Sequence, residues 1–264
     1  MGTVHQTKQD GRRRAVVDAA LTVAGAAILG AALTLRAGVP SPHAVAATAF
    51  GLVVPTVAAI SVLRRRPRLT TAADRVTLTR IVLTGGCATL VVLSLWGDLP
   101  LRSWPLFVMA LPAYLLDGVD GWVARRTNTA SAAGGRLDME SDAVLFLILS
   151  VPLSLSVGPW VLGIGVMRYL FGAASWWRPA LRGSLAFSRF RRIVAGTQGG
   201  VLVAALIPVL PVSVAAVATA VSLALLMVSF GRDVLTLENA DAPPPRDADQ
   251  AHPGSARQGD WAHG

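Results

Sequence analysis

Long apolar runs separated by short polar segments dominate the sequence. Three runs, at residues 15–36, 43–63 and 76–96, each have about the 20 residues that an α-helix needs to cross the hydrocarbon core of a bilayer. Shorter apolar stretches follow at residues 104–116, 142–158, 160–177, 195–210 and 212–230. The pattern predicts an all-α integral membrane protein with eight transmembrane helices. The fourth and fifth stretches are too short to cross alone, so we expect their helices to continue into the acidic segment, residues 117–142, between them.

The distribution of charge supports membrane spans and predicts their orientation. Only 15% of the residues are charged, and the formal net charge is +9. Basic residues gather in alternate connections, near residues 8–14, 64–68, 125–136 and 178–192, whereas the connections between them are nearly neutral. The positive-inside rule therefore predicts that both termini and the acidic segment lie on the cytoplasmic side of the cell membrane. Anionic lipid headgroups are the expected partner of this charge, and no nucleic acid is expected.

The same pattern divides the chain into segments. We expect a basic cytoplasmic N-terminus at residues 1–14, an additional transmembrane hairpin at 15–69, a six-helix domain at 70–232 and a disordered cytoplasmic tail at 233–264. The hairpin has no residues with recognisable chemistry, so dimerisation of the chain and binding of another partner are both left open. The single cysteine, Cys87, lies in an apolar run and is expected to be a small buried residue.

The acidic segment carries the residues with the clearest chemistry. Its spacing is D-x2-D-G-x2-A-R-x8-G-x3-D-x3-D, with the fixed residues at Asp117, Asp120, Gly121, Ala124, Arg125, Gly134, Asp138 and Asp142. On helices, the first two aspartates share one face with two small residues, and the last two aspartates share a face of the next helix. Four carboxylates brought together need a cation among them, and oxygen ligands favour Mg²⁺ or Mn²⁺. Two such ions could clamp a diphosphate for an in-line displacement.

This spacing resembles the signature of the CDP-alcohol phosphotransferase family, and every fixed position is matched. The resemblance implies a six-helix membrane core and transfer of a phosphoalcohol group from a CDP-alcohol to an acceptor hydroxyl, with release of CMP. It implies that two Mg²⁺ or Mn²⁺ ions are held by Asp117, Asp120, Asp138 and Asp142. It also implies that Gly121 and Arg125 hold the CDP moiety, and that Asp142 is the general base for the acceptor hydroxyl. Glu140 points off the face of the aspartates, so a solvated or supporting role is expected.

A second, weaker resemblance precedes the first core helix. The segment Asp74-Arg75-Val76-Thr77 is similar to the P-[ND]-x-[LIV]-T element of the same family, with Ala73 in place of the usual proline. The resemblance implies that Asp74 and Thr77 contact the nucleotide, and that Ser131 lies near the diphosphate.

Three arginines are candidates for binding a phosphorylated acceptor. Arg168 lies within an apolar span, where a cation is costly unless it is paired or lines a polar cavity. It could bind the acceptor phosphate, neutralise the aspartates or form a structural ion pair. Arg189 and Arg192 precede the seventh span. They could set the membrane topology and contact lipid headgroups, or they could bind the phosphorylated acceptor.

Donor and acceptor identities are left open by the sequence. CDP-diacylglycerol is the favoured donor, because lipid tails can reach the site from the bilayer, and a soluble CDP-alcohol with a lipid acceptor is the alternative. The acceptor is open because Met139 and Ala143 stand where phosphatidylglycerophosphate-forming members usually carry Pro and Lys. A membrane prenyltransferase or a cation transporter are competing functions. An ion path would need acidic residues at mid-membrane, whereas these aspartates are expected at one edge.

Overall fold

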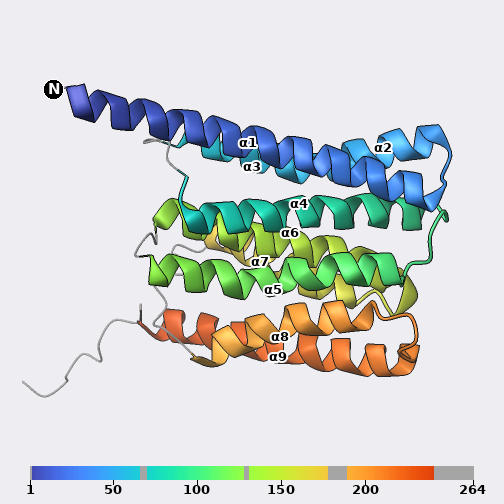
Figure 1. The fold of residues 1–264 in the computed structure, drawn as a ribbon. Coiled ribbons are helices and arrows are strands. Elements are labelled where there is room, and N and C mark those ends of the chain that lie inside the picture. The colour runs from blue at the N-terminus through green and yellow to red at the C-terminus, as the bar shows by residue number, and fades with distance from the viewer. Residues whose placement is uncertain (1, 66–69, 128–130, 178–188, 241–264) are drawn as a thin grey trace, which may run out of the picture.

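The protein is an antiparallel bundle of long helices (Figure 1). The computed structural model describes residues 2–65, 70–127, 131–177 and 189–240, and it contains no strand in those ranges. The helices are α1 (Gly2–Ala37), α2 (Ser41–Gly51), α3 (Val53–Arg64), α4 (Ala72–Leu95), α5 (Trp104–Arg126), α6 (Ala132–Ser156), α7 (Val161–Trp177), α8 (Arg189–Ala205) and α9 (Val212–Ala240). The all-α prediction is confirmed for this part of the chain.

Six helical segments within the described ranges are long and apolar enough to cross a membrane. They are Gly11–Ala37, Ser41–Arg64, Ala72–Leu95, Trp104–Val123, Ala133–Ser156 and Val212–Ser229. The extension of the fourth and fifth helices into the acidic segment is confirmed, since α5 continues to Arg126 and α6 begins at Ala132. Helices α7 and α8 have 17 described residues each, so they are shorter than any of these six segments.

Helix α4 lies at the centre of the bundle, between the N-terminal helices and the remaining core (Figure 1). It packs against α1, α2 and α3 on one side and against α5 and α6 on the other. One apolar cluster joins α4 to the helices that follow it, through residues such as Leu90, Leu106 and Leu149. A smaller cluster joins α1, α3 and α4 and includes Val62 and Ile81. Residues of α4 can therefore contact both the hairpin and the rest of the core.

Two glycines bring the N-terminal hairpin into backbone contact with α4. A Cβ atom on Gly51 of α2 would lie 2.7 Å from the carbonyl oxygen of Gly85, and a Cβ on Gly85 would lie 2.6 Å from the carbonyl oxygen of Gly51. Small residues at such crossings allow close packing of transmembrane helices. The hairpin α1–α3 is therefore packed into the bundle.

Polar contacts fix the connections at the end of the bundle that holds the α4–α5 loop. Arg102, in that loop, donates hydrogen bonds to three carbonyl oxygens at the end of α8 and in the turn before α9, those of Ala205, Ile207 and Leu210. His43 of α2 is bonded to Asp98 at 2.8 Å. Partial burial lowers the pKa of Arg102 from its usual value.

Helix boundaries differ from the sequence prediction at three places. Helix α1 begins at Gly2, so the basic N-terminus is helical. The second span is divided into α2 and α3 at Leu52. Pro55 accounts for the interruption, because it lacks the N–H that would bond to the carbonyl group of Gly51. Helix α9 continues to Ala240, past residue 233 where the tail was expected to begin. Residues 241–264 lie outside the described ranges.

Candidate metal and transferase site

Three aspartates of the acidic segment converge in the bundle. Asp117 comes from α5, whereas Asp138 and Asp142 lie one turn apart on α6. Each offers a carboxylate oxygen, and the three oxygens lie within 4.8 Å of one another. The predicted grouping of these three residues is therefore observed in the structure. The site lies nearer the end where α5 finishes and α4 and α6 begin, which we call the aspartate end.

A guanidinium group lies among the three carboxylates. Nη1 of Arg80 donates to Asp117 Oδ1 at 2.6 Å and to Asp142 Oδ1 at 3.0 Å. Nη2 donates to Asp138 Oδ1 at 2.5 Å and to the Asp138 carbonyl oxygen at 3.1 Å. Arg80 thus connects α4 with both helices of the acidic segment, and it gives the aspartates a common orientation.

The four side chains differ in exposure. The Arg80 side chain is fully buried, whereas those of Asp117, Asp138 and Asp142 are 41, 33 and 31% exposed. Three carboxylates against one guanidinium leave a formal charge of −2. Hard divalent cations bind to oxygen ligands that carry net negative charge and are accessible. The residues present therefore fit Mg²⁺ or Mn²⁺.

Arg80 was missed in the sequence analysis, although a signal for it exists. It lies in the apolar run of residues 76–96, three residues after Thr77. A cation in such a run needs a counter-charge or a polar cavity. The same argument drew attention to Arg168 and applies equally to Arg80. Only the fold shows that the counter-charges are the motif aspartates.

Asp74 anchors the start of α4. Its Oδ2 accepts from the backbone N–H and hydroxyl of Thr71 at 2.9 Å, and Thr71 in turn caps the Asp74 N–H. Its Oδ1 accepts from Arg65 Nη1 at 2.7 Å, and Nη2 of Arg65 donates to the Ala133 carbonyl oxygen at 3.3 Å. Asp74 is buried. Because both of its oxygens are bonded within the protein, the observed contacts of Asp74 are structural, and its contact with the nucleotide stays a prediction.

Two further residues of the predicted CDP site lie beside Asp74. Ser131 is the N-cap of α6, and its hydroxyl accepts from the Gly134 N–H at 3.0 Å. A Cβ on Gly134 would lie 3.1 Å from the Ser131 hydroxyl and 3.5 Å from Asp74 Oδ1, so the glycine allows these groups to approach. Thr77 is buried one turn after Asp74, and its hydroxyl donates to the Ala73 carbonyl oxygen.

The structure describes the remaining predicted site residues in less detail. Gly121 is half-buried in α5, and Glu140 is exposed on α6. The side chains outside the described part of the structure are those of Asp120, Arg125, Arg168, Arg189 and Arg192. Their assignments to metal, CDP and acceptor therefore stay predictions.

Comparison with protein-family models identifies the core. The model of the CDP-alcohol phosphatidyltransferase family matches residues 70–228, more than half of the 264 residues. The chain belongs to the CDP-alcohol phosphatidyltransferase family. No curated protein and no solved structure matches it. The resemblance inferred from the motif is thereby confirmed.

Membership of the CDP-alcohol phosphatidyltransferase family gives the chain a general activity class, transfer of a phosphoalcohol group from a CDP-alcohol. The matched residues include α4 to α8 and most of α9, together with Arg80 and all the motif aspartates. The helices α1 to α3 precede the match. Asp74 is nevertheless bonded to Arg65, which immediately follows α3, so the hairpin contacts the family domain beside its motif.

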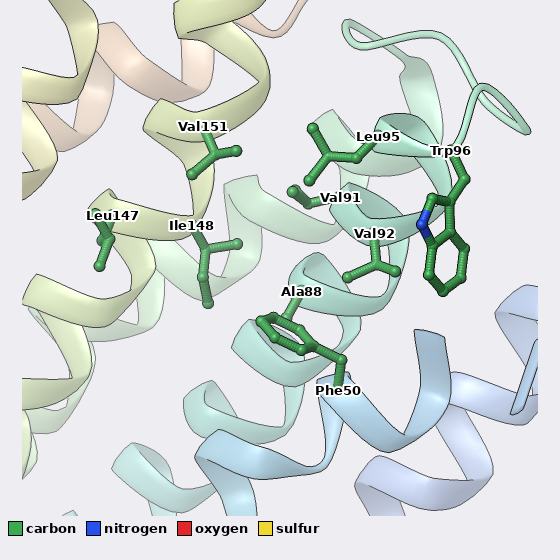
Figure 2. Close-up of a pocket in the computed structure, with 9 residues that line it drawn as sticks. All are labelled: Phe50, Ala88, Val91, Val92, Leu95, Trp96, Leu147, Ile148 and Val151. Carbon is green, nitrogen blue, oxygen red and sulfur yellow. The ribbon is translucent and has the colours of Figure 1, made fainter. Parts of the chain in front are cut away.

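The structure also has an apolar cavity of about 410 Å³ between α2, α4 and α6 (Figure 2). Nine residues line it: Phe50, Ala88, Val91, Val92, Leu95, Trp96, Leu147, Ile148 and Val151. It offers no carboxylate, amine or hydroxyl group. Its lining suits hydrocarbon, and it lies farther along α4 and α6 than Arg80 and Asp142.

Proposed function

We propose that the protein transfers a phosphatidyl group from CDP-diacylglycerol to the hydroxyl group of an acceptor, with release of CMP. The observation that carries this proposal is the convergence of Asp117, Asp138 and Asp142 around Arg80 within the family domain. Carboxylates at this spacing on two helices provide hard oxygen ligands beside a partly exposed surface. With divalent cations bound, such a site would suit an anionic diphosphate.

In the proposed reaction, the acceptor oxygen forms a bond to the phosphorus atom that carries the alcohol. The bond from that phosphorus to the CMP oxygen breaks, and the electron pair leaves with CMP. Asp142 takes the proton of the acceptor hydroxyl as general base. Neutralisation of the diphosphate charge is the chemistry that two Mg²⁺ or Mn²⁺ ions supply when bound by Asp117, Asp120, Asp138 and Asp142.

Arg80 has a positioning role in this proposal. Hydrogen bonds from its guanidinium hold one carboxylate oxygen of each of Asp117, Asp138 and Asp142, and these carboxylates keep part of their surface exposed for another ligand. The CDP group would be held near the starts of α4 and α6 by Asp74, Thr77 and Ser131, together with Gly121 and Arg125. Gly134 would leave room for the approach of Ser131 to Asp74. Arg168, Arg189 and Arg192 are the proposed contacts of a phosphorylated acceptor.

Lipid tails of the donor would lie in the bilayer beside the bundle. The six long apolar helices and the apolar cavity between α2, α4 and α6 support a lipid donor. We further propose that α7 and α8 also cross the cell membrane, which makes eight spans with both termini and the aspartate end in the cytoplasm. A soluble CDP-alcohol with a lipid acceptor uses the same bonds and is the second candidate.

The deciding experiment is CMP release by purified protein from CDP-diacylglycerol with Mg²⁺ or Mn²⁺, screened across inositol phosphate, glycerol phosphate and phosphatidylglycerol as acceptors. The Asp142→Asn variant is measured beside it, with Glu140→Gln as a matched control for an acidic residue on the same helix. Acceptor-dependent release that only Asp142→Asn abolishes would establish the reaction and the acceptor. Release only from a soluble CDP-alcohol with a lipid acceptor would favour the second candidate, and no release from either donor would contradict the proposal.

A further inference from the structure

A second cavity, lined mostly by charged residues, lies outside the aspartate site, between α1 and the start of α4. Its volume is about 350 Å³, and it is lined by Arg13, Arg14, Val17, Asp18 and Arg75. Three guanidinium groups face one carboxylate there, which leaves a formal charge of +2. The cavity joins the hairpin to the family domain, since four of its residues come from α1 and Arg75 comes from α4.

The carboxylate in this cavity is already engaged. Oδ2 of Asp18 accepts from the Thr70 hydroxyl at 2.5 Å and from Arg75 Nε at 3.1 Å. Asp18 therefore holds Arg75 by its Nε, and this contact does not use the two terminal nitrogens of the guanidinium. The side chain of Arg75 is 56% exposed, and that of Asp18 is 10% exposed. Within the described ranges, no ion pair involves Arg13 or Arg14.

This cavity is separate from the aspartate site. Arg75 and Arg80 are five residues apart on α4, which is a rotation of about 140° around an α-helix. Arg80 is fully buried and bonded to residues of α5 and α6, whereas Arg75 is partly exposed and bonded to Asp18 of α1. A ligand beside Arg75 would thus contact the opposite side of α4 from the aspartates.

The position and charge of the cavity indicate its ligand. Its arginines lie at the beginnings of the candidate spans Gly11–Ala37 and Ala72–Leu95, the depth at which lipid headgroups meet water. Guanidinium groups present several N–H donors in a planar fork that matches phosphate oxygens. We propose that Arg13, Arg14 and Arg75 form a binding site for a phosphate group, separate from the transferase site. The source is either the headgroup of an anionic phospholipid or a soluble phosphate.

The test uses full-length protein in a maltoside detergent, which carries no phosphate. One arm measures binding of phosphatidylglycerol by native mass spectrometry, and the other measures binding of inorganic phosphate by ³¹P NMR. The Arg13→Gln/Arg14→Gln variant removes two charges from the cavity. The matched control, Arg12→Gln/Arg64→Gln, removes two exposed charges that do not line the cavity.

The cavity variant is expected to weaken binding by about tenfold or more, because charge-assisted hydrogen bonds are lost, whereas the control changes it less than about twofold. Loss in the phosphatidylglycerol arm alone identifies a lipid headgroup, and loss in the phosphate arm identifies a soluble ligand. Equal weakening by both variants would show diffuse surface charge and overturn the proposal, as would wild-type protein that binds neither probe. If the cavity variant does not fold, Arg13→Lys/Arg14→Lys keeps the charge but loses the fork, and unchanged binding by it in both arms would overturn the proposal.

Discussion

One nitrogen of Arg80 binds Asp138 twice, at the carboxylate and at the backbone carbonyl oxygen, with distances of 2.5 and 3.1 Å. The contact fixes both the side chain and the backbone of Asp138 relative to α4. It joins residues 58 positions apart in the chain. The geometry of the aspartate site therefore depends on a residue outside the D-x2-D-G motif.

Replacement of Arg80 by alanine should destabilise the protein in a way that metal corrects. Without the guanidinium, three carboxylates within 4.8 Å repel one another. A loss of about 2 kcal/mol is expected, less than the 3–5 kcal/mol for a fully buried pair because the aspartates are partly exposed. Thermal unfolding with and without Mn²⁺ measures this. Mn²⁺ should raise the Tm of Arg80→Ala more than that of the wild type, and an equal rise in both would contradict the positioning role.

Asp138→Asn should abolish most of the activity and leave the fold intact. The asparagine keeps a carbonyl oxygen for Arg80 but loses the charge that a divalent cation needs. CMP release is expected to fall by about 100-fold to 1,000-fold, the range for loss of one electrostatic group in an active site. Gel filtration and thermal unfolding should match the wild type. Loss of folded protein would instead assign Asp138 a structural role.

Arg65→Ala should weaken the junction between the hairpin and the family domain. The substitution leaves the buried Asp74 carboxylate with only its bonds to Thr71. About 3 kcal/mol of stability should be lost, and the KM for the CDP-alcohol should rise if Asp74 lies beside the nucleotide. Arg64→Ala is the control, because Arg64 is an exposed neighbour in the same turn. Equal loss of stability in the two variants would mean that the positive charge after α3, rather than the contact with Asp74, stabilises the protein.

Gly51→Ala should separate α2 from α4. The added methyl group would lie 2.7 Å from the Gly85 carbonyl oxygen, and backbone atoms cannot rotate away. A loss of about 1–3 kcal/mol is expected from overpacking. Gly231→Ala in α9 is the control, because a Cβ there meets no atom within 4 Å. Its Tm should be unchanged or slightly raised, since alanine favours helix.

The sequence predicts the helices well because each apolar run has to bury its backbone hydrogen bonds in lipid. Asp138 and Asp142 also follow from helical spacing, because they lie one turn apart on α6. Boundaries such as the break at Leu52 are harder to predict. That break depends on Pro55, which sits in an otherwise unbroken apolar run. The Gly51–Gly85 contact depends on how two helices cross, which residue type alone does not specify.

Pairing partners within the site are the part that sequence reasoning could not supply. The motif indicates that carboxylates gather around positive charge, and metal ions were the expected cations. The structure adds Arg80, whose partners are 37, 58 and 62 residues away. Such distances in sequence carry no periodic signal. Asp74 is a similar case, because its bond to Arg65 is invisible until α3 and α4 are packed together.

The contact between Arg65 and Asp74 shows that residues before the family match at residue 70 contribute to the packing of the family domain. A version beginning at residue 70 would contain every motif residue, yet it would lack Arg65 and Asp18 and would expose the backbone of α4 at Gly85 to lipid. We therefore expect the family domain to need the first three helices for its stability. Transplanting the family domain alone into another chain would require a substitute for all three contacts.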